Sequence, residues 1–304
     1  MAIIRTPEKN FEHLSDFTFT PNYLNFDGKR IHYLDENHHN QATETILCLH
    51  GEPSWCYLYR KMIPILSKKY RVVCFDFIGF GKSDKLTDLN AYNYLLHYNT
   101  LKTIIDQLQL KNITLVVQDW GGLIGLPFAT DYPDLFSRLV IMNTMIPSAR
   151  ATSKWRTFLK TPPFFLWRAF SKYYPNLPIG KIIQWGTVSK LSPAVIAAYN
   201  APFPDKSYKA GAKAWPALVP IFAHNPAAEI MQATRKKLGK WQKPTLVLFS
   251  DSDPITGSHV NFFKKRILGA QQQNHVIIKK AGHFLQEDKG EEIAEHIVKF
   301  IAKN

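Results

Sequence analysis

The chain has 304 residues, of which 45% are hydrophobic and 20% charged, so it can bury a sizeable core, and this composition excludes a disordered or fibrous protein. Lys and Arg (38) outnumber Asp and Glu (24), which gives a formal net charge of +14. The basic residues are scattered in singles and short groups, without a basic arm or zinc-finger spacing, so the charge predicts a solvated basic surface and not nucleic-acid binding.

The cysteines and the N-terminal residues bear on the compartment. Cys48, Cys56 and Cys74 are an odd number, and two of them lie inside apolar runs, which favours a reducing compartment. The first residues lack the apolar stretch of a signal peptide, and no apolar run reaches the roughly 18 residues that could cross a membrane. We therefore expect a cytoplasmic protein without a membrane segment.

The first part of the chain alternates strand and helix patterns. Residues 18–34 alternate apolar and polar side chains around a Phe26-Asp27-Gly28-Lys29 turn, which predicts a two-stranded hairpin. Short apolar runs then follow at 45–49, 71–75, 113–117, 139–142 and 245–249, and helix-length segments such as 57–68 and 91–108 lie between several of them. This order predicts a mostly parallel sheet with helices on both faces.

The alternation stops between residues 146 and 232. This stretch is rich in aromatic residues and proline, and its apolar residues follow no period of two. We expect a helical cap over 146–232, inserted into an α/β core formed by 1–145 and 233–304.

The run 113–117 leads into Gln118-Asp119-Trp120-Gly121-Gly122, and an apolar helical pattern follows. A strand, a sharp turn flanked by small residues and a helix make up a nucleophile elbow, which exposes one side chain at a helix N-terminus. Here that side chain is Asp119, in place of the usual Ser or Cys. The alternative interpretation is that Asp119 only caps the helix.

A second motif, His50-Gly51-Glu52-Pro53, directly follows the run 45–49. In α/β-hydrolases the loop at this place supplies a backbone N–H to the oxyanion hole, and Gly51 permits close approach to the reacting centre. We interpret His50 as a residue that fixes the loop by hydrogen bonding and not as a catalyst.

The third motif contains the candidate base. His283 stands in Ala281-Gly282-His283-Phe284 after the apolar run 275–278. Asp251 and Asp253, which follow the run 245–249, are both candidates to orient its imidazole. The chain order Asp119, acid, His283 is the nucleophile, acid, base order of the α/β-hydrolase fold.

An Asp nucleophile selects the reaction. A carboxylate is already ionised, and its attack on an ester or amide carbonyl would give only an anhydride. Attack at a saturated carbon gives an alkyl ester, which a water activated by His283 can hydrolyse. Alkyl halides and epoxides are the two substrate classes that qualify.

These motifs, together with Asp76-Phe77-Ile78-Gly79-Phe80-Gly81-Lys82-Ser83-Asp84 and Ala201-Pro202-Phe203-Pro204-Asp205, resemble those of haloalkane dehalogenases over nearly the whole chain. The branch with Glu after His-Gly is the most similar. The resemblance implies that Asp253 is the acid, with Asn143 at the alternative acid position. It also implies that the backbone N–H groups of Glu52 and Trp120 form the oxyanion hole.

The leaving group separates the two chemistries. A halide needs neutral donors in a dry pocket, which Trp indoles supply. Trp120 stands beside the nucleophile, and the resemblance implies Trp167 as its cap partner, with Trp155 as the local competitor. An epoxide oxygen needs proton donors instead, for which the cap offers Tyr173, Tyr174, Tyr199 and Tyr208.

Our expectation is a monomeric capped α/β-hydrolase that converts small haloalkanes and water into alcohol, halide and a proton, without a metal or organic cofactor. Phe164, Phe203 and Pro204 are expected pocket walls, with core packing as the alternative interpretation. Epoxide hydrolysis remains the enzymatic alternative. A catalytically inactive binding protein with a basic surface is the non-enzymatic one.

Overall fold

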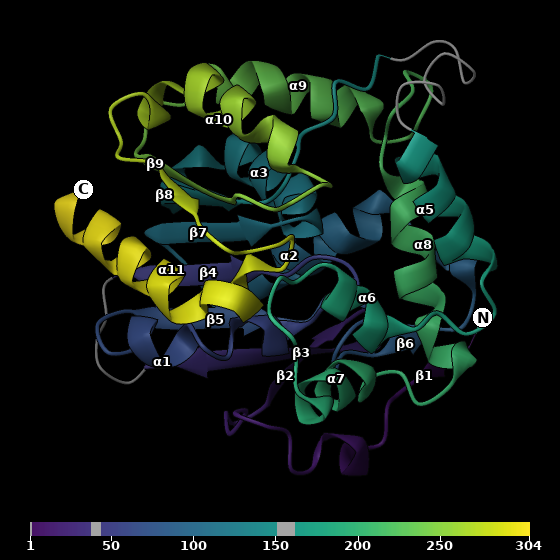
Figure 1. Cartoon of the computed structure of the whole chain (residues 1–304). Coiled ribbons are helices and arrows are strands. Elements are labelled where there is room, and N and C mark those ends of the chain that lie inside the picture. The colour runs from purple at the N-terminus through teal and green to yellow at the C-terminus, as the bar shows by residue number, and fades with distance from the viewer. Residues whose placement is uncertain (1, 38–43, 151–161) are drawn as a thin grey trace.

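An eight-stranded sheet forms the centre of the molecule (Figure 1). The structure is a computed structural model that describes residues 2–37, 44–150 and 162–304. The strands stand in the order β10-β9-β8-β7-β4-β5-β3-β2. Their bounds are β2 Asn22–Phe26, β3 Lys29–Glu36, β4 Thr45–Leu49, β5 Arg71–Phe75, β7 Ile113–Gln118, β8 Phe136–Met142, β9 Thr245–Ser250 and β10 Val276–Ile278.

The sheet is parallel from β10 to β5, and β3 and β2 continue it in antiparallel fashion. The expected hairpin is confirmed, because β2 pairs with β3 across the turn at Asp27 and Gly28. All five apolar runs are strands, which confirms the expected α/β fold class.

Helices cover both faces of the sheet. Successive residues of a strand point to opposite faces, so β4 contributes Leu47 and Leu49 to one core and Ile46 and Cys48 to the other. The first core is closed by α2 Tyr94–Gln107, α3 Trp120–Asp131, α9 Ala228–Leu238 and α10 Val260–Arg266. The second is closed by α1 Ile63–Leu66 and α11 Leu285–Lys303.

The prediction of a helix over 57–68 is wrong for most of that segment. Cys56–Tyr59 forms a 3-10 helix, and the α-helix α1 covers only Ile63–Leu66. Pro64 stands in the first turn of α1, where its missing N–H costs nothing. The helix expected over 91–108 is confirmed as α2, which begins after Asn93, whose side chain accepts the N–H of Leu96.

The chain between β8 and β9 contains no strand of the central sheet among its described residues. It forms α5 Pro162–Tyr173, α6 Ile179–Trp185, α7 Pro193–Asn200 and α8 Ala210–Leu218, and then α9. In Figure 1, α5 and α8 lie side by side at one end of the sheet, and α6 and α7 form a second pair near β3. These helices are therefore an insertion between two neighbouring strands.

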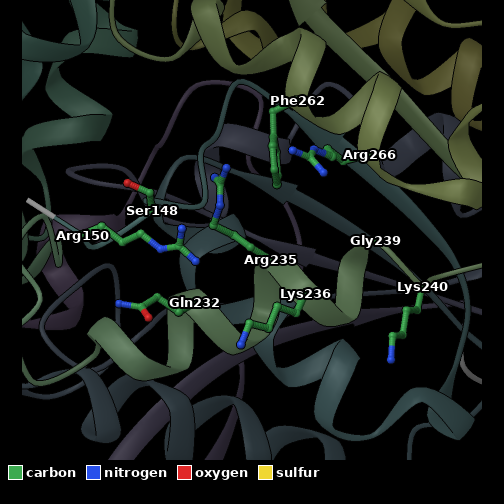
Figure 2. Close-up of a pocket in the computed structure, with 9 residues that line it drawn as sticks. All are labelled: Ser148, Arg150, Gln232, Arg235, Lys236, Gly239, Lys240, Phe262 and Arg266. Carbon is green, nitrogen blue, oxygen red and sulfur yellow. The ribbon is translucent and has the colours of Figure 1, made fainter.

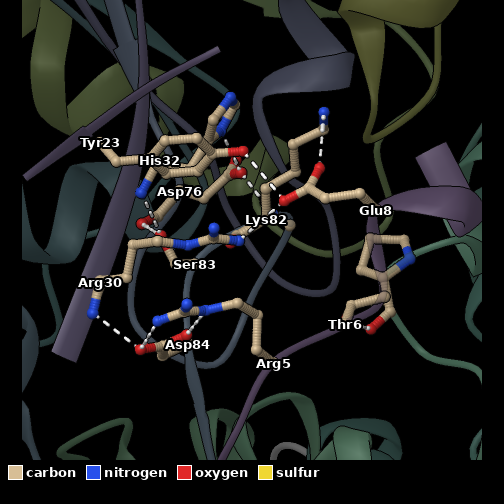
Figure 3. A network of polar contacts seen from close by, with 12 residues as sticks. Arg5, Thr6, Glu8, Tyr23, Arg30, His32, Asp76, Lys82, Ser83 and Asp84 are labelled. Atoms are coloured by element: carbon tan, nitrogen blue, oxygen red, sulfur yellow. Dashed lines mark hydrogen bonds and ion pairs between the residues drawn. The ribbon is translucent and has the colours of Figure 1, made fainter. Parts of the chain in front are cut away.

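The N-terminal residues are tied to the core and to the inserted segment. Ile3–Ile4 (β1) pairs with Lys85–Leu86 (β6), and Arg5 forms a salt bridge of 2.8 Å with the buried Asp84, as Figure 3 shows. The Thr6 hydroxyl donates to the carbonyl of Pro202 (2.7 Å), and the Asn10 amide donates to the carbonyl of Ala201 (3.2 Å).

The described residues contain no helix that is long and apolar enough to cross a membrane. All three cysteines are buried and free, which agrees with the expectation for Cys48 and Cys74.

Candidate active site

Asp119 occupies the sharp turn between β7 and α3. Its backbone adopts φ 49° and ψ −121°, a conformation that costs a non-glycine residue about 1–3 kcal/mol. A Cβ on Gly121 would lie 2.2 Å from the Leu49 carbonyl oxygen, and one on Gly122 would lie 2.1 Å from the Thr144 hydroxyl. The two small residues are therefore required for this turn to pack against its neighbours.

The capping interpretation of Asp119 is wrong. Its side chain makes no capping hydrogen bond to α3. Instead, Oδ1 accepts the backbone N–H of Glu52 at 2.8 Å. Gly51 makes this approach possible, because a Cβ there would lie 2.4 Å from Asp119 Cβ.

His50 fixes the same loop, as expected. Its Nδ1–H donates to the carbonyl of Gly51 (2.9 Å), while Nε2 accepts the backbone N–H of Phe77 (3.1 Å). Burial lowers the pKa of His50, which keeps the ring neutral for this pair of bonds.

His283 lies between two carboxylates, on the turn after β10. Its Nδ1 is 3.1 Å from Asp253 Oδ1, and its Nε2 is 3.5 Å from Asp119 Oδ2. Burial acts to lower the pKa of His283, but Asp253 and Asp119 outweigh it and raise the pKa to about 10.

Of the two acidic candidates after β9, only Asp253 reaches the imidazole. It is buried and accepts N–H bonds from Ile255 (2.8 Å) and Thr256 (3.2 Å) and the Thr256 hydroxyl. Burial acts to raise the pKa of Asp253, but the charge and hydrogen bond of His283, with these donors, lower it to about 2. Asp251 is exposed and instead accepts backbone N–H bonds from Lys280 and Ala281.

Comparisons with known proteins show which proteins this chain is similar to. Residues 44–181 match the family model described as alpha/beta hydrolase fold. A haloalkane dehalogenase from Psychrobacter cryohalolentis is 47% identical, and the alignment covers 100% of this chain and 99% of that protein. The chain belongs to the haloalkane dehalogenases.

Further members of the family are similar over the same length. A haloalkane dehalogenase from Mycobacterium marinum is 45% identical over 98% of this chain and 99% of its own. Among solved structures, the tetrameric haloalkane dehalogenase DpaA from Paraglaciecola agarilytica superposes with a TM-score of 0.89 at 35% identity, covering 97% of each chain.

Two side chains of this candidate site were not anticipated from the sequence. The amide nitrogen of Gln118 is 3.2 Å from Nε2 of His283 and donates to the His283 carbonyl at 3.2 Å. The Glu52 side chain is buried beside Asp119, and burial, followed by the Asp119 charge, raises its pKa well above the usual value. Burial and the Asp119 charge therefore both disfavour ionisation of the Glu52 carboxyl group next to the candidate nucleophile.

Asn143, which the sequence resemblance placed at the alternative acid position, fixes the loop that carries His283. Its side-chain nitrogen donates to Ser250 Oγ (2.8 Å) and to the carbonyls of Gly282 (2.9 Å) and His283 (3.1 Å). An amide in this place supports the loop without adding a third carboxylate to the site.

Trp120 is buried at the start of α3, and its ring lies 4.9 Å from that of Trp215 on α8. Trp215 is fully buried, and its indole N–H donates to His97 Nε2 at 2.5 Å. Burial lowers the pKa of His97 to about 3, so the ring is neutral and can accept this bond. The Trp215 N–H is therefore committed, and Trp215 buttresses Trp120 only through its ring.

The other expected pocket residues lie in different surroundings. Trp167 and Phe164, on α5, are half-buried and pack against the core that contains Trp120. Phe203 is buried, and the Lys85 ammonium lies 5.9 Å from its ring centre; Pro204 is exposed. Trp155 lies outside the described residues.

The tyrosines that an epoxide hydrolase would need are poorly placed as a donor pair. Tyr173 and Tyr174 are exposed. The Tyr199 hydroxyl donates to Glu287, and Tyr208 is half-buried. This arrangement, together with the relatives, does not favour epoxide hydrolysis.

One group of described residues has the ligand types of a metal site. The ligand atoms of His32, Cys56 and Asp76 lie within 4.8 Å of one another. Asp76 is already bonded to His32 Nδ1 (2.7 Å) and to the N–H groups of Cys56 and Lys82 (Figure 3 shows His32 and Asp76). Burial raises the pKa of the Cys56 thiol, which opposes the thiolate form that a metal needs. The group is a hydrogen-bonded junction between loops.

Proposed function

We propose that this chain hydrolyses the carbon–halogen bond of small haloalkanes through a covalent ester on Asp119. The observation that carries the proposal is the position of the Asp119 carboxylate, with Oδ1 on the Glu52 N–H and Oδ2 facing His283. An Asp at an elbow that usually carries Ser or Cys suits displacement at a saturated carbon.

The first step uses Asp119 alone. Oδ2, which is not bound by the Glu52 N–H, attacks the carbon that bears the halogen. A C–O bond forms, the carbon–halogen bond breaks, and the halide leaves with the bonding electron pair. The indole N–H groups of Trp120 and Trp167 bind the departing halide, and Phe164, Phe203 and Pro204 contact the alkyl chain.

The second step uses His283 and Asp253. Nε2 takes a proton from water, the water oxygen attacks Cγ of the ester, and Asp253 stabilises the resulting imidazolium. The N–H groups of Glu52 and Trp120 stabilise the oxyanion that forms on Oδ1. The Cγ–Oδ2 bond then breaks, the leaving alkoxide takes the proton of the new hydroxyl group to become the alcohol, and the carboxylate is restored. His283 keeps the proton that it took from water, and releases it to solvent when the next alkylation lowers its pKa.

The inserted helices supply a cap over residues 146–232, while 1–145 and 233–304 form the core. The C-terminal end of the cap lies within α9, which packs against α3. We place the enzyme in the cytoplasm as a monomer, and the three free, buried cysteines support a reducing compartment.

A panel of chloro-, bromo- and iodoalkanes, assayed beside epoxides, tests the proposal. The wild type should release halide and form alcohol, with little diol from the epoxides. Asp119→Ala should remain folded but lose turnover, because the covalent route is gone. Halide release from Asp119→Ala at a near wild-type rate would refute the assignment, and absence of turnover in the wild type would favour an inactive binding protein.

A further inference from the structure

A cavity of about 360 Å³ lies outside the catalytic residues, between the segment that follows β8 and the helices α9 and α10 (Figure 2). This volume falls within the range of small-molecule sites. Among the described residues its lining contains no carboxylate, and its charged side chains are all cationic: Arg150, Arg235, Lys236, Lys240 and Arg266.

These five cations have no acidic partner among the described residues. Within the three described ranges of the chain, none of them forms an ion pair. Lys237, the next residue along α9, does pair with Asp131 at 2.6 Å, so an acidic partner is available to the neighbouring side of the helix. Because like charges at one site repel, their convergence without a counter-charge indicates an anion-binding cavity.

Arg235 is the cation of this cavity that is held in a fixed position. Its Nη1–H donates to the Ile146 carbonyl at 2.6 Å, and its guanidinium carbon lies 4.0 Å from the centre of the Phe262 ring. Burial lowers the pKa of Arg235, and the charges of Arg266 and Arg150 lower it further. These contacts hold the guanidinium in one place while its surroundings leave the positive charge uncompensated.

The segment after β8 is also held in position. The Gln232 amide donates to the Ala149 carbonyl at 2.9 Å and so ties α9 to the residues that carry Ser148 and Arg150 into the cavity. The cavity therefore combines fixed donors on one wall with exposed Lys236, Lys240 and Arg266 at its edge.

We propose that this cavity binds a small polyphosphate, a ligand with two or three linked phosphate groups, either free or as the tail of a nucleotide. Five cations carry more positive charge than a single phosphate group can neutralise. Arg and Lys are the residues that recognise phosphate oxygens. Arg235 covers a face of Phe262, so the contacts offered to the ligand are mainly those to phosphate. A compact cavity, and not an extended basic stripe, favours a small ligand over a nucleic-acid chain.

Titration calorimetry with inorganic tripolyphosphate tests the proposal. The variant Lys236→Gln/Lys240→Gln/Arg266→Gln should bind at least ~10-fold more weakly than the wild type, because three charge-assisted contacts are removed. A matched control, Lys68→Gln/Lys69→Gln/Lys111→Gln, removes three exposed charges elsewhere and should bind as the wild type does. Equal affinity in the two triple variants would overturn the proposal, as would absence of binding to the wild type.

Further ligands distinguish the source of the phosphates. ATP and tripolyphosphate should bind with similar affinity and compete, whereas sulfate should bind more weakly and adenosine should not compete. Displacement of tripolyphosphate by adenosine, or equal affinity for sulfate, would contradict recognition of linked phosphates. Lys240→Glu, a single exposed change, gives an independent variant that should also weaken binding. None of these measurements depends on haloalkane turnover, so they stand apart from the proposed function.

Discussion

The proposed mechanism requires His283 to respond to a change of charge at Asp119. In the resting site Asp253 and Asp119 together raise the pKa of His283 to about 10, so the imidazole holds a proton at neutral pH. In the proposed mechanism, alkylation converts Asp119 into a neutral ester and removes one of these two charges. The pKa of His283 then falls, and the neutral ring becomes available as a base for water.

His283→Gln should separate the two steps. In the proposed mechanism Asp119 attacks carbon without a base, so a folded variant should release about one halide per active site in a burst and then stop. The alkyl group should remain on Asp119, because nothing activates water against the ester. Mass spectrometry of the quenched protein should find the added alkyl mass on the peptide that contains Asp119. Sustained turnover, or a burst without that mass, would rule out the covalent scheme.

Asp253 and Asp251 offer a matched pair of carboxylates. Asp253→Asn should slow hydrolysis of the ester more than alkylation, because the imidazolium loses its counter-charge. Asp251→Asn should be milder, since Asp251 contacts only backbone N–H groups and Ser252. Single-turnover kinetics with separate measurement of halide and alcohol would check this, and equal losses in two folded variants would contradict it.

Sequence reasoning identified the candidate triad but missed side chains whose role depends on burial. Asp119 and His283 stand in recognisable motifs, and the resemblance selected Asp253 over Asp251. Gln118 precedes the nucleophile, but no local pattern indicates that its amide reaches His283. The raised pKa of Glu52 could not be predicted either, because it depends on burial and on Asp119.

At the scale of elements, α5 and α3 should bring two indoles to the halide. Trp167→Phe should weaken halide binding and slow carbon–halogen cleavage, because one N–H donor is lost. Trp185→Phe is a suitable control, since Trp185 is largely exposed on α6. Quenching of tryptophan fluorescence by halide would measure binding. Trp155→Phe should matter less than Trp167→Phe, and the reverse ranking would move the halide ligand to Trp155.

Strands were easier to predict than helices in this chain. A parallel strand buried on both faces is a continuous apolar run, as β4 and β9 are. The segment 57–68 is apolar enough for a buried helix, but Tyr57 and Tyr59 are fully buried in a 3-10 turn and α1 starts only at Ile63. Tertiary packing decides such a segment, and local pattern does not contain that information.

At the scale of the whole molecule, the oligomeric state can be measured directly. Light scattering coupled to gel filtration should give the 34.9 kDa of a monomer, as expected from the sequence. The related structure from Paraglaciecola agarilytica is described as tetrameric. A mass about four times larger would show that the expectation of a monomer is wrong.

The contacts of residues 3–10 matter for handling the protein. Arg5 is bonded to the core at Asp84, while Thr6 and Asn10 are bonded to the inserted segment at Pro202 and Ala201. The N-terminal arm thus acts as a tether across the two parts that should enclose the substrate. Deleting these residues, or fusing a bulky affinity tag to them, would disrupt contacts that connect the core to the inserted segment. The exposed last residues of α11 are the safer attachment point for immobilising this dehalogenase on a support.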